Sequence, residues 1–274
     1  MKTIQESMTT LFRPLPKASV NASTLLPSLL TKTTSSLKDI IVKVIPSTIA
    51  VPFVKKHHYS GKVVNNSKLH FGAFLDGRLH GVMSFGSPLD KRKVIGLVVD
   101  ENGNPAPWND MLELNRMAFD DVLPPNSESR CISVAIRLIR KNAPQIKWIL
   151  SFADGMQCGD GTIYRASGFK LTGFSSGSMW LLPPELQKIN QGPVAHRMKV
   201  QNKCSSLSKW VMAKTNGKNL TMEKCAELFG GSICEGYMLR YIKILDQKYH
   251  LSVPEIPFSK IQEVGAGMYK GEKR

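Results

Sequence analysis

The stretch that decides the fold is "IKWILSFADGMQCGDGTIYRASGF", residues 146–169. Its apolar start has the length and composition of a strand that is buried on both faces. Asp154 follows this strand directly, and a short helix is predicted at about 160–167, with Gly168 as its stop. Because open α/β sheets bind ligands at the carboxyl ends of their strands, we expect Asp154 and Tyr164 at a functional edge of the sheet.

The upstream sequence predicts the other elements of a mixed α/β sheet. These are a strand at 39–46, a helix at 47–59, a hairpin at 69–88, a strand at 111–119 and a helix at 127–144. Ser47 is the expected N-cap of the first helix, and Gly61 lies just past its end. The hairpin is predicted from its Asp-Gly dipeptide. A right-handed crossover makes the strands at 111–119 and 146–153 parallel, so that their carboxyl ends share one edge.

The downstream sequence predicts an interrupted end of the sheet. One or two strands are predicted at 170–182 and a closing strand at 236–249, with short basic helices between them. The Ser-, Thr- and Leu-rich N-terminus predicts an extension outside the core. We therefore divide the chain into an extension (1–36), a catalytic core (37–182), a basic helical insertion before the last strand (183–235), and a closing strand with a tail (236–274).

Positive charge is concentrated at both ends of the chain. The net charge of +16 divides into +6 over residues 1–60, +3 over 61–182 and +7 over 183–274. Basic flanks around a nearly balanced core favour a nucleic acid as partner over general solubility charge. The stretches "KKHH", "KVVNNSK" and "DKRK" are candidate phosphate contacts, although basic loops are usually solvated faces.

Several classes of protein are excluded by the sequence. There is no run of eighteen apolar residues to span a membrane, and the N-terminus lacks the apolar run of a secretory signal. The five cysteines contain no CxxC pair, which favours reduced thiols over disulfides or a zinc site. We therefore expect a cytoplasmic protein without a membrane partner.

Three polar side chains near the predicted sheet edge are candidates for chemistry. Asp154 could accept a proton from an attacking amine as a general base; alternatively, it caps the turn that follows. Tyr164 could donate to a leaving group, stack on a base or bind a metal; alternatively, it packs in the core. Arg116 shares the parity of the apolar residues in its strand, so it needs a phosphate, a substrate carbonyl or a buried partner; alternatively, it pairs with a nearby carboxylate at the surface.

Two further sets of candidates lie at helix ends. His58 and Tyr59 are adjacent, so both can serve one site only if their helix ends there; otherwise His58 is a favourable charge at the helix terminus. Ser127, Ser129 and Arg130 occupy the first turn of the later helix, where backbone amides attract an anion, so we expect them to bind the donor. Ser129 could instead only satisfy the amides of that turn.

Five separated blocks of sequence support a family resemblance. The blocks are "HHYSGKVV", "LHFGAF", "ELNRMAF", "NSESR" and "SFADG-x-x-CGDGTIYRASGF", in that order. The element order and the "IYRASGF" helix ending resemble GNAT acyltransferases. The five blocks together resemble the Mom family of phage DNA-modification proteins, over about 38–182 and 236–258. This resemblance implies a GNAT-like central mixed sheet with flanking helices, in which one strand splays from its neighbour and an acyl donor meets an amine in the cleft.

The resemblance also implies a function and a set of site residues. Mom-type proteins convert adenine N6 in duplex DNA to N6-carbamoylmethyladenine, which protects the DNA from restriction. The family's functional positions fall here on His58, Tyr59, Arg116, Ser129, Asp154 and Tyr164. The resemblance implies an iron ion held by His58, Tyr59, Asp154 and Tyr164. It implies double-stranded DNA as the partner in a bacterial host cell, and we add tRNA and a second copy of the chain as further candidates.

One departure from GNAT enzymes bears on the donor. Those enzymes hold the CoA pyrophosphate in a glycine-containing turn, whereas the corresponding turn here, "PPNSESR", has no glycine. This difference argues against CoA as the donor. The methylene that joins the carbamoyl group to N6 in the implied product instead favours an activated glycine such as glycyl-tRNA, with acetyl-CoA as the competing candidate. The hypothesised route is glycyl transfer to N6 followed by an intramolecular rearrangement. The adenine must be flipped out of the duplex, and Trp148, Trp180 or Tyr164 could stack on it.

Two other functions are carried as alternatives. A GNAT N-acetyltransferase acting on a small amine or RNA would bind CoA and leave DNA unaltered. A DNA-binding protein with an inactive core would show salt-dependent binding and lose nothing when Asp154 is replaced by alanine.

Overall fold

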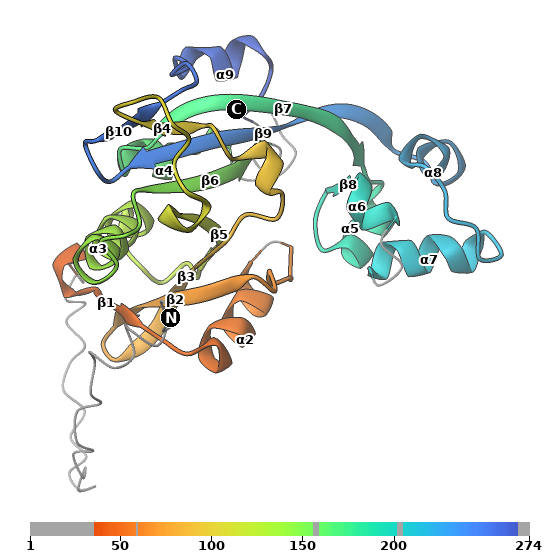
Figure 1. Cartoon of the computed structure of the whole chain (residues 1–274). Helices are drawn as coiled ribbons and strands as arrows, with labels where there is room; N and C mark the ends of the chain where they lie inside the picture. The colour runs from red at the N-terminus through yellow and green to blue at the C-terminus, as the bar shows by residue number, and fades with distance from the viewer. Residues whose placement is uncertain (1–35, 59, 156–158, 202–204, 268–274) are drawn as a thin grey trace, which may run out of the picture.

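The computed structural model describes residues 36–58, 60–155, 159–201 and 205–267. Within them, eight strands form one mixed sheet in the order β1-β2-β3-β5-β6-β9-β7-β8, and β4 and β10 form a separate ribbon (Figure 1). The strands are β1 (Ile41–Val44), β2 (Ser67–Leu75), β3 (Arg78–Gly86), β4 (Val98–Asp100), β5 (Met111–Phe119), β6 (Trp148–Asp154), β7 (Lys170–Leu181), β8 (Val194–His196), β9 (Ser232–Ile244) and β10 (Tyr249–Leu251). The predicted α/β fold, a mixed sheet with flanking helices, is confirmed.

The helices include three short 3₁₀ turns. The α-helices are α2 (Ser47–His57), α3 (Ser127–Asn142), α4 (Thr162–Ala166), α5 (Pro184–Asn190), α6 (Arg197–Gln201), α7 (Ser206–Lys214), α8 (Met222–Phe229) and α9 (Ser259–Glu263). The 3₁₀ turns are η1 (Leu37–Asp39), η2 (Lys91–Lys93) and η3 (Trp108–Asp110). The predicted N-terminal extension lies almost wholly outside the described residues.

The predicted hairpin is confirmed, and its turn has the backbone conformation that its sequence favours. Asp76 and Gly77 connect β2 to β3, with φ angles of 49° and 76°. Positive φ at both turn residues is the mark of a type I′ turn, whose twist matches that of two paired strands. The turn therefore sets the register of the hairpin that borders the site.

Strands β5 and β6 are parallel, as predicted, but they pair over only part of their length. Their paired positions run from Met111↔Trp148 to Leu114↔Ser151. Beyond this point β5 remains paired with β3, whereas β6 pairs with β9 as far as Asp154. The two strands therefore diverge after Leu114 and Ser151, with Asp154 at the end of one of them.

A bulge in β5 changes the direction of Arg116. Leu114 pairs with Phe85 and Arg116 pairs with Ser84, so Asn115 is an extra residue in β5. An extra residue reverses the alternation of side chains along a strand. Arg116 therefore faces the side of the sheet that α2 covers, away from the face to which Leu114 contributes. The prediction that Arg116 shares the apolar face of its strand is wrong for this reason.

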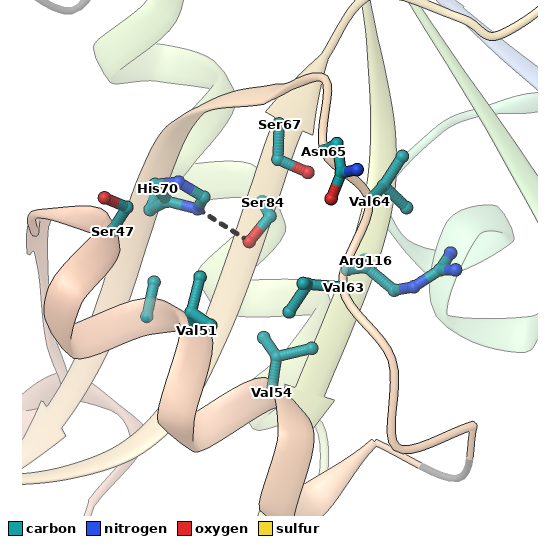
Figure 2. Close-up of a pocket in the computed structure, with 11 residues that line it drawn as sticks. Ser47, Val51, Val54, Val63, Val64, Asn65, Ser67, His70, Ser84 and Arg116 are labelled. Carbon is teal, nitrogen blue, oxygen red and sulfur yellow. Dashed lines mark hydrogen bonds between the residues drawn. The ribbon is translucent and has the colours of Figure 1, made fainter. Parts of the chain in front are cut away.

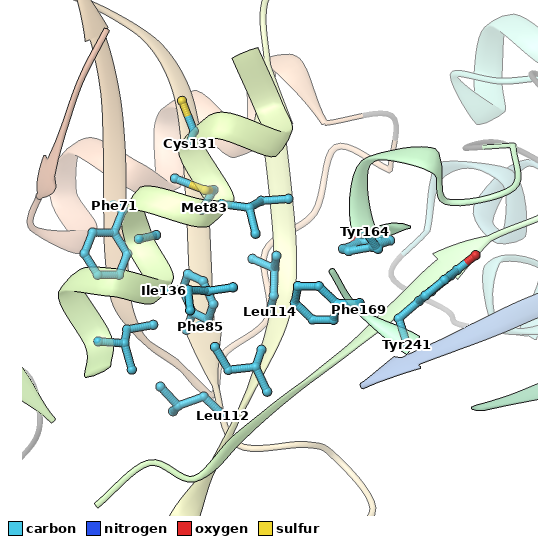
Figure 3. Close-up of a cluster of buried hydrophobic side chains, with 14 of the residues drawn as sticks. Phe71, Met83, Phe85, Leu112, Leu114, Cys131, Ile136, Tyr164, Phe169 and Tyr241 are labelled. Atoms are coloured by element: carbon cyan, nitrogen blue, oxygen red, sulfur yellow. The ribbon is translucent and has the colours of Figure 1, made fainter. Parts of the chain in front are cut away.

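Both faces of the sheet are covered. On one face α3 and α4 pack against side chains from β2, β3, β5, β6 and β9 (Figure 3). On the other face α2 covers β3 and β5, and the β4–β10 ribbon covers β5, β6 and β9. The β6 side chains alternate between the two layers, with Ile149 and Ala153 in the first and Trp148 and Leu150 in the second. The predicted burial of this strand on both faces is confirmed.

Strands β7 and β9 extend beyond the rest of the sheet as a curved ribbon that carries a small helical unit (Figure 1). Their pairing continues to Leu181↔Ser232, so the closing strand begins before the predicted residue 236. Helices α5, α7 and α8, together with β8, pack around a separate core that includes Trp180. The chain between β7 and β9 therefore forms short helices as predicted, while the domain boundaries themselves stay a prediction.

Two local details, at Ser47 and at the two tryptophans, differ from the sequence prediction. The capping position of α2 is Pro46, so Ser47 is the first residue of the helix and not its N-cap. Pro52 lies inside α2. Trp148 and Trp180 are at most 2 % exposed, so neither side chain can stack on a base as expected.

Two expectations from composition can be compared with the structure. No helix in the described part of the chain is long and apolar enough to cross a membrane. Cys131, Cys225 and Cys234 are free thiols. Burial raises the pKa of Cys131 to about 12 and that of Cys225 to about 11, so both thiols are protonated and unreactive near neutral pH.

Candidate active-site cleft

A cleft opens where β5 and β6 diverge. It has a volume of about 220 Å³ and is lined from β5, β6, β9, α4 and the end of α2. Four residues predicted from the sequence line it together: His58, Arg116, Asp154 and Tyr164. The structure thus brings side chains more than 100 positions apart in the sequence to one site.

Asp154 is held at the cleft by a histidine from the insertion. Its carboxylate is buried, and Oδ2 lies 2.8 Å from Nε2 of His196. His196 is the last residue of β8, which pairs with β7 through Met179↔His196. The sequence analysis did not identify His196, because its contact with Asp154 is set by how the ribbon curves and no local motif marks it.

Tyr164 is both a core residue and part of the cleft wall. Its ring stacks on Tyr241 with centroids 5.2 Å apart and meets Phe169 edge-on at 5.6 Å (Figure 3). Only 7 % of the residue is exposed. The short helix α4 that carries it starts after Gly161, whose φ of 70° suits glycine. These contacts fix the ring, so Tyr164 presents a rigid surface to the cleft.

Arg116 lies between the cleft and a second cavity on the α2 side of the sheet. Its Nε donates to the carbonyl of Lys62 (3.0 Å) and a terminal nitrogen donates to the carbonyl of Asn115 (2.6 Å). The α2-side cavity has a volume of about 380 Å³ and contains the buried pair His70–Ser84, joined at 2.8 Å (Figure 2). The guanidinium extends away from that pair in Figure 2. Backbone carbonyls therefore fix the guanidinium of Arg116, and its role at the site stays a prediction.

His58 enters the cleft from the end of α2. It occupies the C-cap position, and its Nδ1 accepts a hydrogen bond from the backbone N–H of Ser60 (3.1 Å). Burial lowers the pKa of His58 to about 4, and the charge of Arg116 acts in the same direction. His58 is therefore neutral near pH 7, and its accepting Nδ1 leaves the proton on Nε2. The alternative role of His58 as a positive charge at the helix terminus does not hold at neutral pH.

Glu113 is a titratable group in the cleft that the sequence analysis did not assign to the site. Burial raises the pKa of its carboxyl to about 7, although the charge of Arg116 acts against this shift. A buried carboxyl with such a pKa is a frequent feature of functional sites. Nothing in its sequence neighbourhood separates Glu113 from a carboxylate on a strand surface, because the divergence of the strands creates its environment.

Asn115 lines the cleft, and a hydrogen bond fixes its side-chain amide. Its Oδ1 accepts from the hydroxyl of Ser67 at 2.8 Å, which orients the amide. Its Nδ2 is buried and has no hydrogen-bond partner among the described residues, and the residue lines the cleft. A buried donor without a partner is costly, so this group is poised for a ligand acceptor.

The residues expected to bind the donor do not line the cleft. Ser127 donates to the carbonyl of Pro124, and Ser129 donates to that of Asn126 (3.1 Å). Arg130 donates through Nε to the carbonyl of Leu37 at 2.6 Å. All three side chains therefore donate to backbone carbonyls, and their role in donor binding stays a prediction.

The iron site also stays a prediction. His58, Asp154 and Tyr164 line the cleft, whereas Tyr59 lies outside the described residues. Among the residues that the structure describes, no three His, Cys, Asp or Glu side chains are placed to hold a metal ion. Two of the four predicted ligands are tyrosines, of which only Tyr164 is described, so the role of these residues in holding iron stays a prediction.

Comparisons with known proteins identify a family. The model of the Mom protein family matches residues 39–260. The protein "Methylcarbamoylase mom" of Escherichia phage Mu is 38% identical over 152 residues, which cover 54% of this chain and 59% of that protein. The chain thus matches about three fifths of the length of this relative.

Solved structures with similar architecture are acetyltransferases. A Bacillus subtilis acetyltransferase in complex with CoA is 10% identical, with a TM-score of 0.39, and the match covers 76% of this chain and 99% of that one. A GNAT family acetyltransferase from Elizabethkingia anophelis with acetyl-CoA bound is 11% identical, with the same TM-score and the same shares covered. The strand order and the diverging β5–β6 pair agree with a GNAT-like fold. Since the family model spans most of the chain, from β1 to α9, the protein belongs to the Mom protein family.

Proposed function

We propose that this protein is a phage-type DNA-modification enzyme that converts adenine N6 in duplex DNA to N6-carbamoylmethyladenine. The observation that carries the proposal is the convergence of the family's positions on one cleft, where His58, Arg116, Asp154 and Tyr164 meet. The Mu relative is named a methylcarbamoylase, which agrees with this product. The product shields phage DNA from restriction in the cytoplasm of the bacterial host.

The cleft residues have complementary roles in the proposed transfer. The exocyclic amine of adenine is a weak nucleophile, so it needs a proton acceptor, which the Asp154–His196 pair supplies. The carbonyl oxygen of the acyl donor gains negative charge as the amine attacks. The unpartnered Nδ2 of Asn115 can donate to that oxygen, and one such donor typically contributes about 10²–10³-fold to turnover.

The donor that fits the product without a redox step is an activated glycine. Transfer of glycine from an ester such as glycyl-tRNA forms a bond between N6 and the glycyl carbonyl carbon and releases the tRNA hydroxyl. The glycine amine then attacks C6 through a five-membered ring and expels the original N6. The product carries the glycine nitrogen on C6, followed by the methylene and a terminal amide that contains the former N6. Acetyl-CoA remains the competing donor.

Two lysines, Lys62 and Lys199, lie close enough for their charges to interact, and the charge of Lys199 also acts on the cleft residues His58 and Asp154. Lys62 follows α2 and Lys199 lies in α6 of the insertion, and the charge of Lys62 adds to burial in lowering the pKa of Lys199. Two cations this close to a cleft would bind the phosphates on either side of a flipped nucleotide. This arrangement supports double-stranded DNA as the partner; a tRNA partner follows only from the glycyl donor, and a homodimer remains a prediction.

The proposal is tested by restriction and by isotope tracing. Plasmid from cells that produce the protein should resist restriction enzymes that cut at adenine-containing sites, whereas plasmid from cells with an empty vector should be cut. With glycine labelled at the nitrogen and both carbons, all three labels should enter the modified adenine. Label that enters from acetate but not from glycine would rule out the glycyl route and leave the modification itself standing.

A further inference from the structure

The hydrogen bond between Asp154 and His196 connects two cavities. Asp154 lines the 220 Å³ cleft, and His196 lines a separate cavity of about 790 Å³ beside the insertion. Met238 lines both cavities and is the β9 partner of Asp154. The side chain of Asp154 is 1% exposed and that of His196 is 33% exposed. The carboxylate is therefore covered, while the histidine is open to a ligand in the larger cavity.

We propose that His196 accepts the proton, that Asp154 orients His196, and that the flipped adenine occupies the larger cavity. This inference rests on the proposed function and adds to it the residue that accepts the proton and the cavity that holds the base. A carboxylate only accepts hydrogen bonds, so Asp154 holds the imidazole proton on Nε2 and leaves Nδ1 as the acceptor. A buried carboxylate behind a more exposed histidine is the same division of roles as in the Ser-His-Asp triad.

The larger cavity suits a purine base. Its volume lies within the range of about 300–1,000 Å³ that is usual for ligand sites, whereas the cleft is smaller. Met179, Met222 and Met238 line it, and thioethers pack favourably against aromatic rings. The side chains of Gln201 and Thr221 add donors and acceptors for the edge of the base. These methionines provide the packing surface that the two buried tryptophans cannot.

The two cavities place the reactants on either side of Asp154. With the base in the larger cavity and the acyl group in the cleft, N6 and the acyl carbon meet at the junction formed by Met238. N6 forms its bond to the carbonyl carbon and gives its proton to Nδ1 of His196, while the bond to the leaving oxygen breaks. The imidazolium, stabilised by Asp154, then gives that proton to the leaving oxygen, so the step is balanced.

The position of His196 in the insertion gives that segment a catalytic role. Arg197 follows His196 directly and lines the same cavity, where its guanidinium can bind the phosphate of the flipped nucleotide. The insertion would therefore close the base site, supply the proton acceptor and bind the phosphate backbone of the DNA.

Kinetics of purified variants test the assignment of His196. His196→Gln keeps an amide donor for Asp154 but cannot accept a proton, so it should melt and bind DNA like the wild type while turnover falls about 10²–10⁴-fold. His196→Ala should lose as much turnover and regain part of it when imidazole is added, because the open cavity admits the free base. A purely structural role for His196 would produce no such rescue.

The matched control is His250→Ala. His250 is exposed on β10, so this variant should retain wild-type turnover and show no response to imidazole. The assignment is overturned if His196→Gln keeps more than half of the wild-type turnover while Asp154→Asn abolishes it, because Asp154 would then be the proton acceptor itself. Folded His196→Ala protein that imidazole does not reactivate overturns it as well.

The base site is tested without turnover by NMR of methionine methyl groups. Duplex DNA added to protein with ¹³C-labelled methionine methyls should shift the signals of Met179, Met222 and Met238 by ring current, while Met111 in the core should stay unshifted. Gly177→Phe should abolish these shifts, since a Cβ at Gly177 meets no atom within 4 Å and the ring can fill the cavity. DNA that binds without shifting the three signals overturns the base site. A wild type that shows the shifts but forms no product contradicts the proposed reaction and leaves the base site in place.

Discussion

Burial shifts the pKa of two titratable residues in the cleft in the direction that favours their neutral forms. Burial raises the pKa of Glu113 to about 7 and lowers that of His58 to about 4. Each shift makes the stability of the fold depend on pH, but with opposite sign. For Glu113 the folded state binds the proton more tightly than the unfolded state, so stability is lost as pH rises from about 4.5 to 7. For His58 stability is lost as pH falls from about 6.5 to 4.

Replacement of Glu113 by glutamine should remove the first of these losses. The variant should be as stable as the wild type near pH 4.5 and more stable at pH 8. In the wild type, the shift of the Glu113 pKa corresponds to at most about 3 kcal/mol of stability, and solvent screening will reduce this value. Chemical unfolding at several pH values measures the difference. An equal effect of the substitution at pH 4.5 and pH 8 would contradict the proposed burial of this carboxyl.

At the scale of elements, α2 determines where His58 lies. The helix contains Pro52, whose missing N–H leaves the carbonyl of Thr48 without its helical donor. Pro52→Ala restores that donor at an exposed position, so it should raise the free energy of unfolding by about 1–3 kcal/mol. If Pro52 is needed to orient the end of α2, and with it His58, the more stable variant will be less active. A lower melting temperature for this variant would contradict an ordinary helical conformation at residue 52.

Elements with strong local signals could be predicted from the sequence, and contacts between elements could not. The Asp76-Gly77 turn, the apolar strand β6 and its terminal Asp154 follow from turn chemistry and periodicity. The bulge at Asn115 has no local signal, so the face of Arg116 was predicted wrongly. The bond from His196 to Asp154 depends on the curvature of the β7–β9 ribbon, which a sequence pattern does not contain.

At the scale of the whole molecule, the excess positive charge should govern DNA affinity. The chain carries a net charge of +16, and the insertion exposes Lys209 and Lys218 near α7. Each phosphate contact contributes about 0.9 to the slope of log K against log salt. Replacement of both lysines by alanine should weaken binding for all duplex sequences and reduce the slope by about 1–2. Binding isotherms at several salt concentrations measure this, and an unchanged slope would place the DNA elsewhere on the protein.

Nucleoside mass spectrometry of plasmid DNA from producing cells tests the central claim most directly. The wild-type chain should yield deoxyadenosine heavier by one carbamoylmethyl group. The adduct should disappear with Asp154→Asn, because this change removes the carboxylate between the two cavities. It should persist with Asp76→Asn, the same substitution in the hairpin turn, where asparagine is equally suited. Unmodified DNA beside folded wild-type protein, or an adduct that survives in Asp154→Asn, would contradict the proposed DNA modification at this cleft.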